Sequence, residues 1–261
     1  MAPGKGDRFL PRIGVLMGDP NGVGPELAAK LLKLPEVYER ARIVVVAPSS
    51  VWESGQRIAG ASIDALRVDG IDKLAFAPGR PSLLSLPVVE ADSGAIGQAT
   101  RGAGAAVLRQ LTFVADALAA GHIEGVVFAP LNKQAMRMAG LTQEDELEYV
   151  AEHLGVRDPV CELNMLDGLW TSRVTSHVPL RRVADLVTVD AVCTGAYVIE
   201  KALRMSGVGR PKIAVCARNA HAGDGGPMGR EEMYVIAPGL ASLQGGGRDA
   251  RGPFPSDTAF F

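Results

Sequence analysis

The sequence predicts an α/β fold built around a largely parallel sheet. Short apolar runs rich in β-branched residues recur along the chain, as expected of strands buried on both faces. Most of these runs are followed by a turn and then by an amphipathic segment, which is the alternation of parallel βα units. The 261 residues can bury a large core, and we expect them to form two lobes.

Five runs are expected to be the buried strands. They are residues 13–17 (IGVLM), 42–47 (RIVVVA), 125–129 (GVVFA), 173–175 (RVT) and 212–217 (KIAVCA).

The helices are marked by their ends. Pro25 suits the first turn of a helix that runs to about Leu32, because the N–H that proline lacks would be unpaired there. Residues 97–121 have apolar side chains at helical spacing and end on a glycine, so one long helix is expected. A second is expected over residues 190–207, from an aspartate cap to a glycine stop. The Gly- and Pro-rich residues 244–255 predict a flexible loop.

Composition and charge argue against nucleic-acid and membrane partners. The net charge is -2, from 27 basic and 29 acidic residues, and no basic tail is present. Acidic small molecules remain possible ligands. The three cysteines are widely spaced, which favours reduced thiols in a cytoplasmic protein. The N-terminus lacks a signal-peptide core, and no apolar run reaches the ~18 residues of a membrane helix.

The stretch GDPNGVGPE, residues 18–26, leads from the first strand into the first helix. Its glycine spacing matches neither the dinucleotide fingerprint nor the phosphate loop of nucleotide-binding proteins. A turn in this position can still offer backbone N–H groups to an anion. The alternative is that Gly22 and Gly24 only permit a positive φ in a tight turn.

Lys133 lies in a similar position. The segment APLNKQAM, residues 129–136, follows a predicted strand and places this lysine at or near the start of a helix. The helix dipole disfavours a positive charge there unless an anion or a carboxylate compensates it. Lys133 is therefore either a functional cation or a solvated surface lysine.

Two of the four histidines are candidate metal ligands. His177 and His221 each follow the carboxyl end of a predicted strand, where open α/β sheets collect their ligands. Two imidazoles can share a divalent metal with a carboxylate, for which Asp224 and Asp257 are the nearby candidates. The alternative is two unrelated loop histidines. His122 and His153 lie near helix ends, where the dipole alone accounts for them.

Several motifs together resemble one enzyme family. The chain resembles the 4-hydroxythreonine-4-phosphate dehydrogenases of pyridoxal phosphate biosynthesis over almost its whole length. The motifs, in chain order, are GDPNGVGPE, SGAIGQATRGAGAAVL, APLNKQAMRMAG, VTSHVPLRRVADLVT, NAHAGDGGPMGREE and GPFPSDTAFF. The resemblance implies a two-lobed α/β/α fold like that of isocitrate and isopropylmalate dehydrogenases, and a homodimer that shares its active site across the subunit boundary.

The resemblance also implies site residues and a reaction. His177 and His221 correspond to metal ligands for Zn, Mg or Co, and Asp257 corresponds to an active-site aspartate. Lys133 and Asn219 lie in motifs that imply substrate contact. The implied reaction is NAD-dependent oxidation of a secondary alcohol, followed by loss of CO2 from the resulting β-keto acid. Lys133 could hold a substrate carboxylate or phosphate, or transfer a proton, and these roles stay open.

The chain departs from the family pattern in two places. Residues 143–149 read QEDELEY where the family has a G-H-T-E substrate motif; Glu148 matches the final glutamate and an acidic residue near Glu146 replaces the histidine. Carboxylates there oppose an anionic substrate, so a dehydrogenase for another diol or hydroxyacid, such as a terephthalate cis-dihydrodiol, is the alternative.

The second departure is at Phe261, where the resemblance stops before a third metal histidine and a C-terminal segment. We therefore expect one incomplete two-lobed chain, residues 1–261, truncated at its C-terminus. A further alternative follows, in which the chain is an inactive fragment that binds an anion or a metal.

Overall fold

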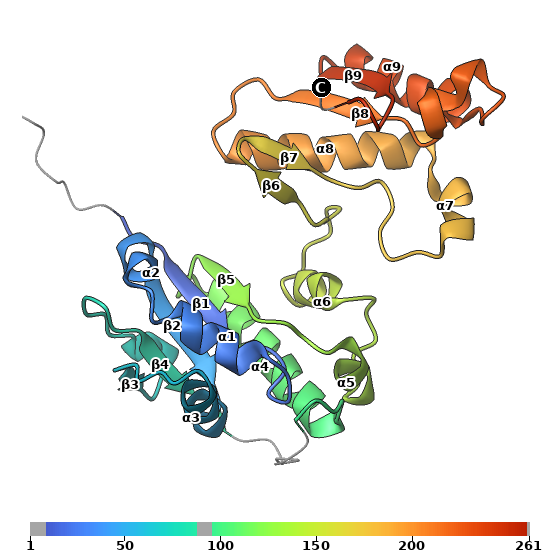
Figure 1. Cartoon of the computed structure of the whole chain (residues 1–261). Coiled ribbons are helices and arrows are strands. Elements are labelled where there is room, and N and C mark those ends of the chain that lie inside the picture. Colours follow the sequence, from blue (N-terminus) through green and yellow to red (C-terminus); the bar gives the residue numbers. More distant parts are fainter. Residues whose placement is uncertain (1–8, 88–95, 260–261) are drawn as a thin grey trace, which may run out of the picture. The chain divides into compact units, whose positions relative to one another are not determined.

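The computed structural model describes residues 9–87 and 96–259. The chain divides into two compact units, Met1–Arg157 (unit 1) and Asp158–Phe261 (unit 2) (Figure 1). Within the described residues, no helix is both long enough and apolar enough to cross a membrane.

A parallel sheet of five strands is the centre of unit 1. The strand order is β3-β4-β2-β1-β5, and each neighbouring pair runs parallel. The strands are β1 (Arg12–Leu16), β2 (Arg42–Ala47), β3 (Leu66–Val68), β4 (Ser82–Ser85) and β5 (Gly125–Phe128). The β-branched side chains of β1 and β2 fit the pleated surface of a strand covered on both faces.

Alternate side chains of the central strands enter two separate cores. Val15 of β1 and Met17, which follows the strand, lie in the core that also contains Trp52, whereas Leu16 lies in the core that contains Leu111 and Met136. Such alternation follows from the two-residue period of a strand. The sheet therefore lies between two helical layers.

The helices of unit 1 supply these layers (Figure 1). They are α1 (Gly24–Leu31), α2 (Pro35–Arg40), α3 (Ser49–Ile58), the 3₁₀ turn η1 (Ile71–Lys73), α4 (Arg101–Ala119), α5 (Lys133–Met138) and α6 (Glu146–His153). α1 and α3 cover one face, and α4 and α5 cover the other. A Cβ on Gly104 of α4 would lie 1.9 Å from the carbonyl oxygen of Ala135, so only glycine permits this approach of α5.

Unit 2 has its own smaller core. A hairpin, β6 and β7, is followed by helices that pack on the parallel pair β8 and β9. The elements are β6 (Asn164–Leu166), β7 (Leu169–Thr171), α7 (Leu180–Leu186), α8 (Val189–Met205), β8 (Lys212–Cys216), η2 (Ala220–Gly225), η3 (Glu232–Ile236), α9 (Ala237–Gly245) and β9 (Asp249–Phe254). The core contains Val192, Ile199, Ile213 and Leu240.

The α/β prediction is confirmed, and four of the five expected strands occur as β1, β2, β5 and β8. The run at residues 173–175 is not a strand. The strand there is β7, slightly earlier, because Trp170 packs on the core of unit 2 whereas Val174 is exposed.

The helix predictions need smaller corrections. α4 begins at Arg101, because the hydroxyl of Thr100 accepts a hydrogen bond from the Ala103 N–H at 3.1 Å and caps the helix. α8 is capped in the same way by Thr188 and not by Asp190.

The prediction of a flexible loop at residues 244–255 is wrong, because these residues contain β9. The strand pairs with β8, and Ala250 is buried against the core. Backbone pairing gives this segment the order that its Gly- and Pro-rich composition does not indicate.

Candidate active site

The carboxyl ends of β8 and β9 bring predicted site residues together in unit 2. Because the strands are parallel, the residues that follow them meet at one edge. The Ala217 N–H donates to the carbonyl oxygen of Phe254 at 2.7 Å, and the Ser256 hydroxyl donates to the carbonyl oxygen of Ala217 at 2.6 Å. These bonds tie together the two segments that carry His221 and Asp257.

His221 and Asp257 form a pair at this edge. The distance from His221 Nδ1 to Asp257 Oδ2 is 3.7 Å, and the side chains are 70% and 58% exposed. Both side chains are therefore accessible to a substrate or a cation, and the imidazole nitrogen and carboxylate oxygen are donors that divalent metals accept.

The loop that carries His221 has an unusual backbone. Six consecutive residues have positive φ: His221 (52°), Ala222 (55°), Gly223 (81°), Asp224 (47°), Gly225 (72°) and Gly226 (122°). Three of them, His221, Ala222 and Asp224, carry side chains that make this backbone conformation costly. Strain of this kind is found where the surrounding contacts enforce it, often at functional sites.

Glu232 supplies such contacts from the start of η3. Its Oε1 accepts hydrogen bonds from the backbone N–H groups of Arg218 at 2.9 Å and Asn219 at 2.8 Å. Its Oε2 accepts from Asn219 Nδ2 at 2.9 Å. Burial opposes ionisation of this carboxyl, but the hydrogen bonds from Asn219 and Arg218 prevail and lower the pKa of Glu232.

Glu231 is a second carboxylate beside the same amide. It accepts a hydrogen bond from Asn219 Nδ2 at 2.7 Å and pairs with the Arg218 guanidinium. The hydrogen bond from Asn219, a backbone N–H and the Arg218 charge lower the pKa of Glu231 to about 2. The side-chain N–H groups of Asn219 are thus directed to protein carboxylates, so substrate contact through this residue would fall to its Oδ1.

His177 also lies in unit 2, between β7 and α7, and has a φ of 54°. Over residues 9–87 and 96–259, no group of three or more His, Cys, Asp and Glu side chains could hold a metal ion. The structure thus pairs His221 with Asp257 but does not gather a third donor of these kinds around them. His177 stays a predicted ligand.

Lys133 is the first residue of α5 in unit 1, as the sequence predicts. Asn132 caps the helix through its side-chain oxygen, which accepts from the Ala135 N–H at 3.0 Å. The expected compensating carboxylate is Glu146, whose Oε2 lies 3.9 Å from Lys133 Nζ. This oxygen is buried and has no hydrogen-bond partner.

The acidic residues around the start of α6 have different roles. Asp145 caps α6 by accepting from the Glu148 N–H at 3.0 Å, and Glu148 Oε2 accepts from the Glu144 N–H at 3.0 Å. This reciprocal arrangement resembles a capping box, which the D-x-x-E spacing of the sequence could have revealed. Glu146 is left to face Lys133.

In the GDPNGVGPE turn, residues 18–26, polar groups form hydrogen bonds within the protein. Asp19 is buried, and its carboxylate accepts from the Asn21 N–H at 2.9 Å, which places a negative charge inside the turn. The positive φ occurs at Gly18 and not at Gly22 or Gly24. Gly24 is needed for a different reason, because a Cβ there would lie 2.2 Å from the carbonyl oxygen of Met17. Gly18 and Gly24 thus serve close packing.

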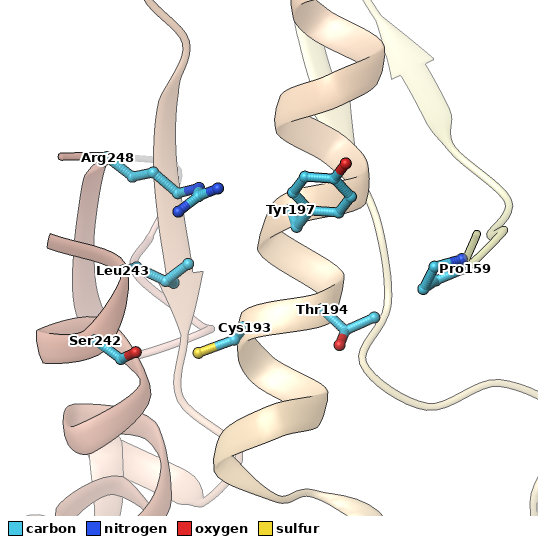
Figure 2. Close-up of a pocket in the computed structure, with 7 residues that line it drawn as sticks. All are labelled: Pro159, Cys193, Thr194, Tyr197, Ser242, Leu243 and Arg248. Atoms are coloured by element: carbon cyan, nitrogen blue, oxygen red, sulfur yellow. The ribbon is translucent and has the colours of Figure 1, made fainter. Parts of the chain in front are cut away.

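A cavity of about 260 Å³ lies between α8 and α9 in unit 2 (Figure 2). Its lining contains none of the predicted site residues and consists of Pro159, Cys193, Thr194, Tyr197, Ser242, Leu243 and Arg248. The Arg248 guanidinium lies 5.9 Å from the Tyr197 ring centre and pairs with Glu200. Its charge is therefore already compensated by the protein.

Parallel strands that are followed by polar side chains, here a lysine–glutamate pair and a histidine–aspartate pair, are typical of α/β enzymes. The family model described as pyridoxal phosphate biosynthetic protein PdxA matches residues 39–261. A Pseudomonas aeruginosa protein, provisionally named 4-hydroxythreonine-4-phosphate dehydrogenase 2, is 42% identical over 251 residues, 96% of this chain and 74% of that protein. The chain therefore belongs to the PdxA family, whose named relatives are oxidoreductases.

A further relative and a solved structure carry the same enzyme name, and a second solved structure shares the fold. The 4-hydroxythreonine-4-phosphate dehydrogenase of Geobacter metallireducens is 36% identical and covers 96% of this chain, which spans 74% of it. The crystal structure of the Klebsiella pneumoniae enzyme of that name has a TM-score of 0.86 at 27% identity, covering 98% of this chain and 77% of that one. A terephthalate 1,2-cis-dihydrodiol dehydrogenase from Burkholderia xenovorans, at 23% identity and a TM-score of 0.59 over 95% of this chain and 75% of that one, shares the fold.

Proposed function

We propose that this chain catalyses NAD-dependent, divalent-metal-dependent oxidation, with decarboxylation, of 4-hydroxythreonine 4-phosphate or a close analogue. Family membership supports the reaction class. The observation that carries the proposal is the His221–Asp257 pair at the carboxyl edge of β8 and β9.

His177 and His221 are the proposed metal ligands, with Asp257 as a neighbouring carboxylate. His221 and Asp257 fit a divalent cation by their chemistry and accessibility, while the part of the chain that the structure describes gathers no third donor beside them. When bound, such an ion supplies Lewis acidity toward the substrate hydroxyl and the enolate that decarboxylation leaves.

The chain's own residues have separate proposed roles. Asp257 accepts the hydroxyl proton, while the C–H bond at the same carbon breaks and its hydrogen leaves with the bonding electron pair, as hydride, to NAD⁺. The product ketone is a β-keto acid, which loses CO2. Lys133 binds an anionic group of the substrate, and Asn219 Oδ1 is available to accept a substrate hydrogen bond.

Glu146 favours a second candidate substrate. A carboxylate 3.9 Å from Lys133 Nζ opposes a doubly charged phosphate and suits a group that donates hydrogen bonds, such as a hydroxyl. The alternative is therefore a dehydrogenase for another diol or hydroxyacid. One relative, 32% identical, is provisionally named D-threonate 4-phosphate dehydrogenase. The likeness to the terephthalate dihydrodiol enzyme supports the fold alone.

A substrate panel tests these alternatives. The chain is mixed with NAD and Mg²⁺, Zn²⁺ or Co²⁺, then with 4-hydroxythreonine 4-phosphate, D-threonate 4-phosphate or the terephthalate cis-dihydrodiol, and formation of NADH is followed by absorbance. Turnover of the first substrate supports the proposal. Turnover of only the dihydrodiol excludes it in favour of the alternative, and metal binding without any turnover identifies an inactive binding fragment.

The proposal includes a cytoplasmic homodimer with a shared active site. Two inactive variants, Lys133→Ala and His221→Ala, would test the sharing. If one site takes residues from both subunits, mixing and reassociating the variants restores part of the activity. A monomeric mass by light scattering would exclude the dimer.

A further inference from the structure

The Glu232 carboxylate contacts the His221 loop on both sides of the histidine. Before His221, Glu232 Oε1 accepts from the backbone N–H groups of Arg218 and Asn219 at 2.9 and 2.8 Å. After His221, the loop passes so close that a Cβ on Gly223 would lie 2.9 Å from Glu232 Oε2. One side chain therefore holds the start of the loop by hydrogen bonds and lies close to its left-handed part.

Glu232 is suited to this task by its burial. Only 3% of the residue is exposed, although an isolated buried carboxylate is costly. The three hydrogen bonds that it accepts compensate that cost, and two of them come from backbone groups whose positions define the path of the loop. A buried ion of this kind restricts the backbone more than an exposed one does.

The loop needs such a restraint. His221, Ala222 and Asp224 adopt left-handed φ values that residues with side chains disfavour. Without contacts that enforce it, this backbone is expected to relax, and the His221 ring would move relative to Asp257. The carboxylate also lies at the start of η3, a single turn of π-helix, which is a rare feature that is frequent at functional sites.

We propose that Glu232 is a positioning residue that holds the His221 loop in its left-handed conformation and so fixes the His221–Asp257 pair. The inference rests on the proposed function for one step, the binding of a metal by His221. Glu231 differs from Glu232 in this role, because its side chain contacts the side chains of Asn219 and Arg218 and not the backbone N–H groups of the loop.

The test compares Glu232→Gln with Glu200→Gln. Glu200 is a matched control, because it is 8% exposed, lies in the same unit and binds Arg204 and Arg248 away from the loop. Two quantities are measured on the full chain: amide hydrogen exchange of residues 217–229 without metal, and Co²⁺ affinity by absorption titration. Circular dichroism verifies that each variant is folded.

The Glu232→Gln variant should exchange faster at Arg218 and Asn219 and bind Co²⁺ more weakly, each by about tenfold or more, because bonds to a charged acceptor are lost. Glu200→Gln should leave both quantities close to wild type even if it melts earlier. Should Glu232→Gln not fold, Glu232→Asp keeps the charge but withdraws it by one methylene, and it should show smaller losses in the same direction.

Unchanged exchange and Co²⁺ affinity in the folded Glu232 variants would overturn the inference. Faster exchange with unchanged affinity would overturn the link to His221. If wild type binds no Co²⁺, or His221→Ala binds it equally well, the metal assignment of the proposed function fails instead. In that case the exchange of Arg218 and Asn219 still decides whether Glu232 holds the loop.

Discussion

His221 Nδ1 lies 3.7 Å from Asp257 Oδ2, although 36 positions separate the two residues in the chain. The pair exists because β8 and β9 are parallel and end at the same edge. The two groups are near enough to influence each other's charge but too far apart for a direct hydrogen bond. A cation or a substrate hydroxyl could contact both.

Replacing Asp257 should weaken the metal site. Asp257→Asn keeps the size of the side chain and removes its charge, so metal retention after dialysis and turnover should each fall by about 10–100-fold. Elemental analysis and NADH formation measure the two effects. Asp224→Asn is the matched control, because asparagine tolerates the left-handed backbone found there. Equal losses in both variants would contradict the role of Asp257.

Replacing Glu146 should improve the binding of phosphorylated substrates. Glu146→Gln removes a negative charge 3.9 Å from Lys133 Nζ, so KM for 4-hydroxythreonine 4-phosphate should fall several-fold, with little change in kcat. Steady-state kinetics measures this change. Glu144→Gln, an exposed position of the same segment, should leave KM unaltered. A higher KM in Glu146→Gln would show that the carboxylate binds the substrate directly.

Two glycine substitutions should have opposite effects on stability. Gly104→Ala forces a Cβ to within 1.9 Å of the Ala135 carbonyl oxygen and should lower the free energy of unfolding by about 3 kcal/mol or more. Gly195 is also inside a long helix, but a Cβ there meets its nearest neighbour, Val174 Cγ2, at 3.8 Å. Gly195→Ala should therefore raise stability by about 0.5–1 kcal/mol. Urea unfolding distinguishes the two, and a similar loss in both would refute the packing argument.

Glu231 should contribute to acid sensitivity. Hydrogen bonding from Asn219, together with a backbone N–H and Arg218, lowers the pKa of Glu231 from 4.5 to about 2 in the folded chain. A depressed pKa stabilises the folded state above the unfolded pKa, and that stability is lost as the pH falls from about 4.5 toward 2. Across this range, the free energy of unfolding of Glu231→Gln should therefore fall less steeply with decreasing pH than that of wild type. Parallel curves for the variant and wild type would contradict this prediction.

The sequence allows the central sheet to be predicted because its strands are continuous apolar runs. β1, β2, β5 and β8 are found within a residue or so of their expected bounds. β9 is missed because Ala250 is its only fully buried apolar side chain and the rest of its order comes from pairing with β8. Three expectations stay predictions: the likeness to isocitrate dehydrogenase, the truncation, and the assignment of all residues to one incomplete two-lobed dehydrogenase.

The candidate site is predictable in part for a similar reason. Lys133 and His221 follow strands, and the ends of parallel strands locate them. Glu232 could not be found in this way, since a glutamate in GREEM looks like any residue of a helix surface until the fold brings Arg218 and Asn219 against it. Likewise, only the structure shows that Glu146, rather than another carboxylate of this acidic segment, faces Lys133.

The turn at Gly18–Asn21 has a consequence for recombination between relatives. The Asp19 N–H donates to the carbonyl oxygen of Pro130 at 3.0 Å, and Asn21 Nδ2 donates to the carbonyl oxygen of Gln98 at 3.2 Å. A Cβ on Gly18 would lie 2.5 Å from the same Pro130 oxygen. A chimera could take the segment after its first strand from one homologue and the Lys133 segment from another. The two segments must then fit each other at Gly18 and Pro130, or Lys133 is no longer held in place.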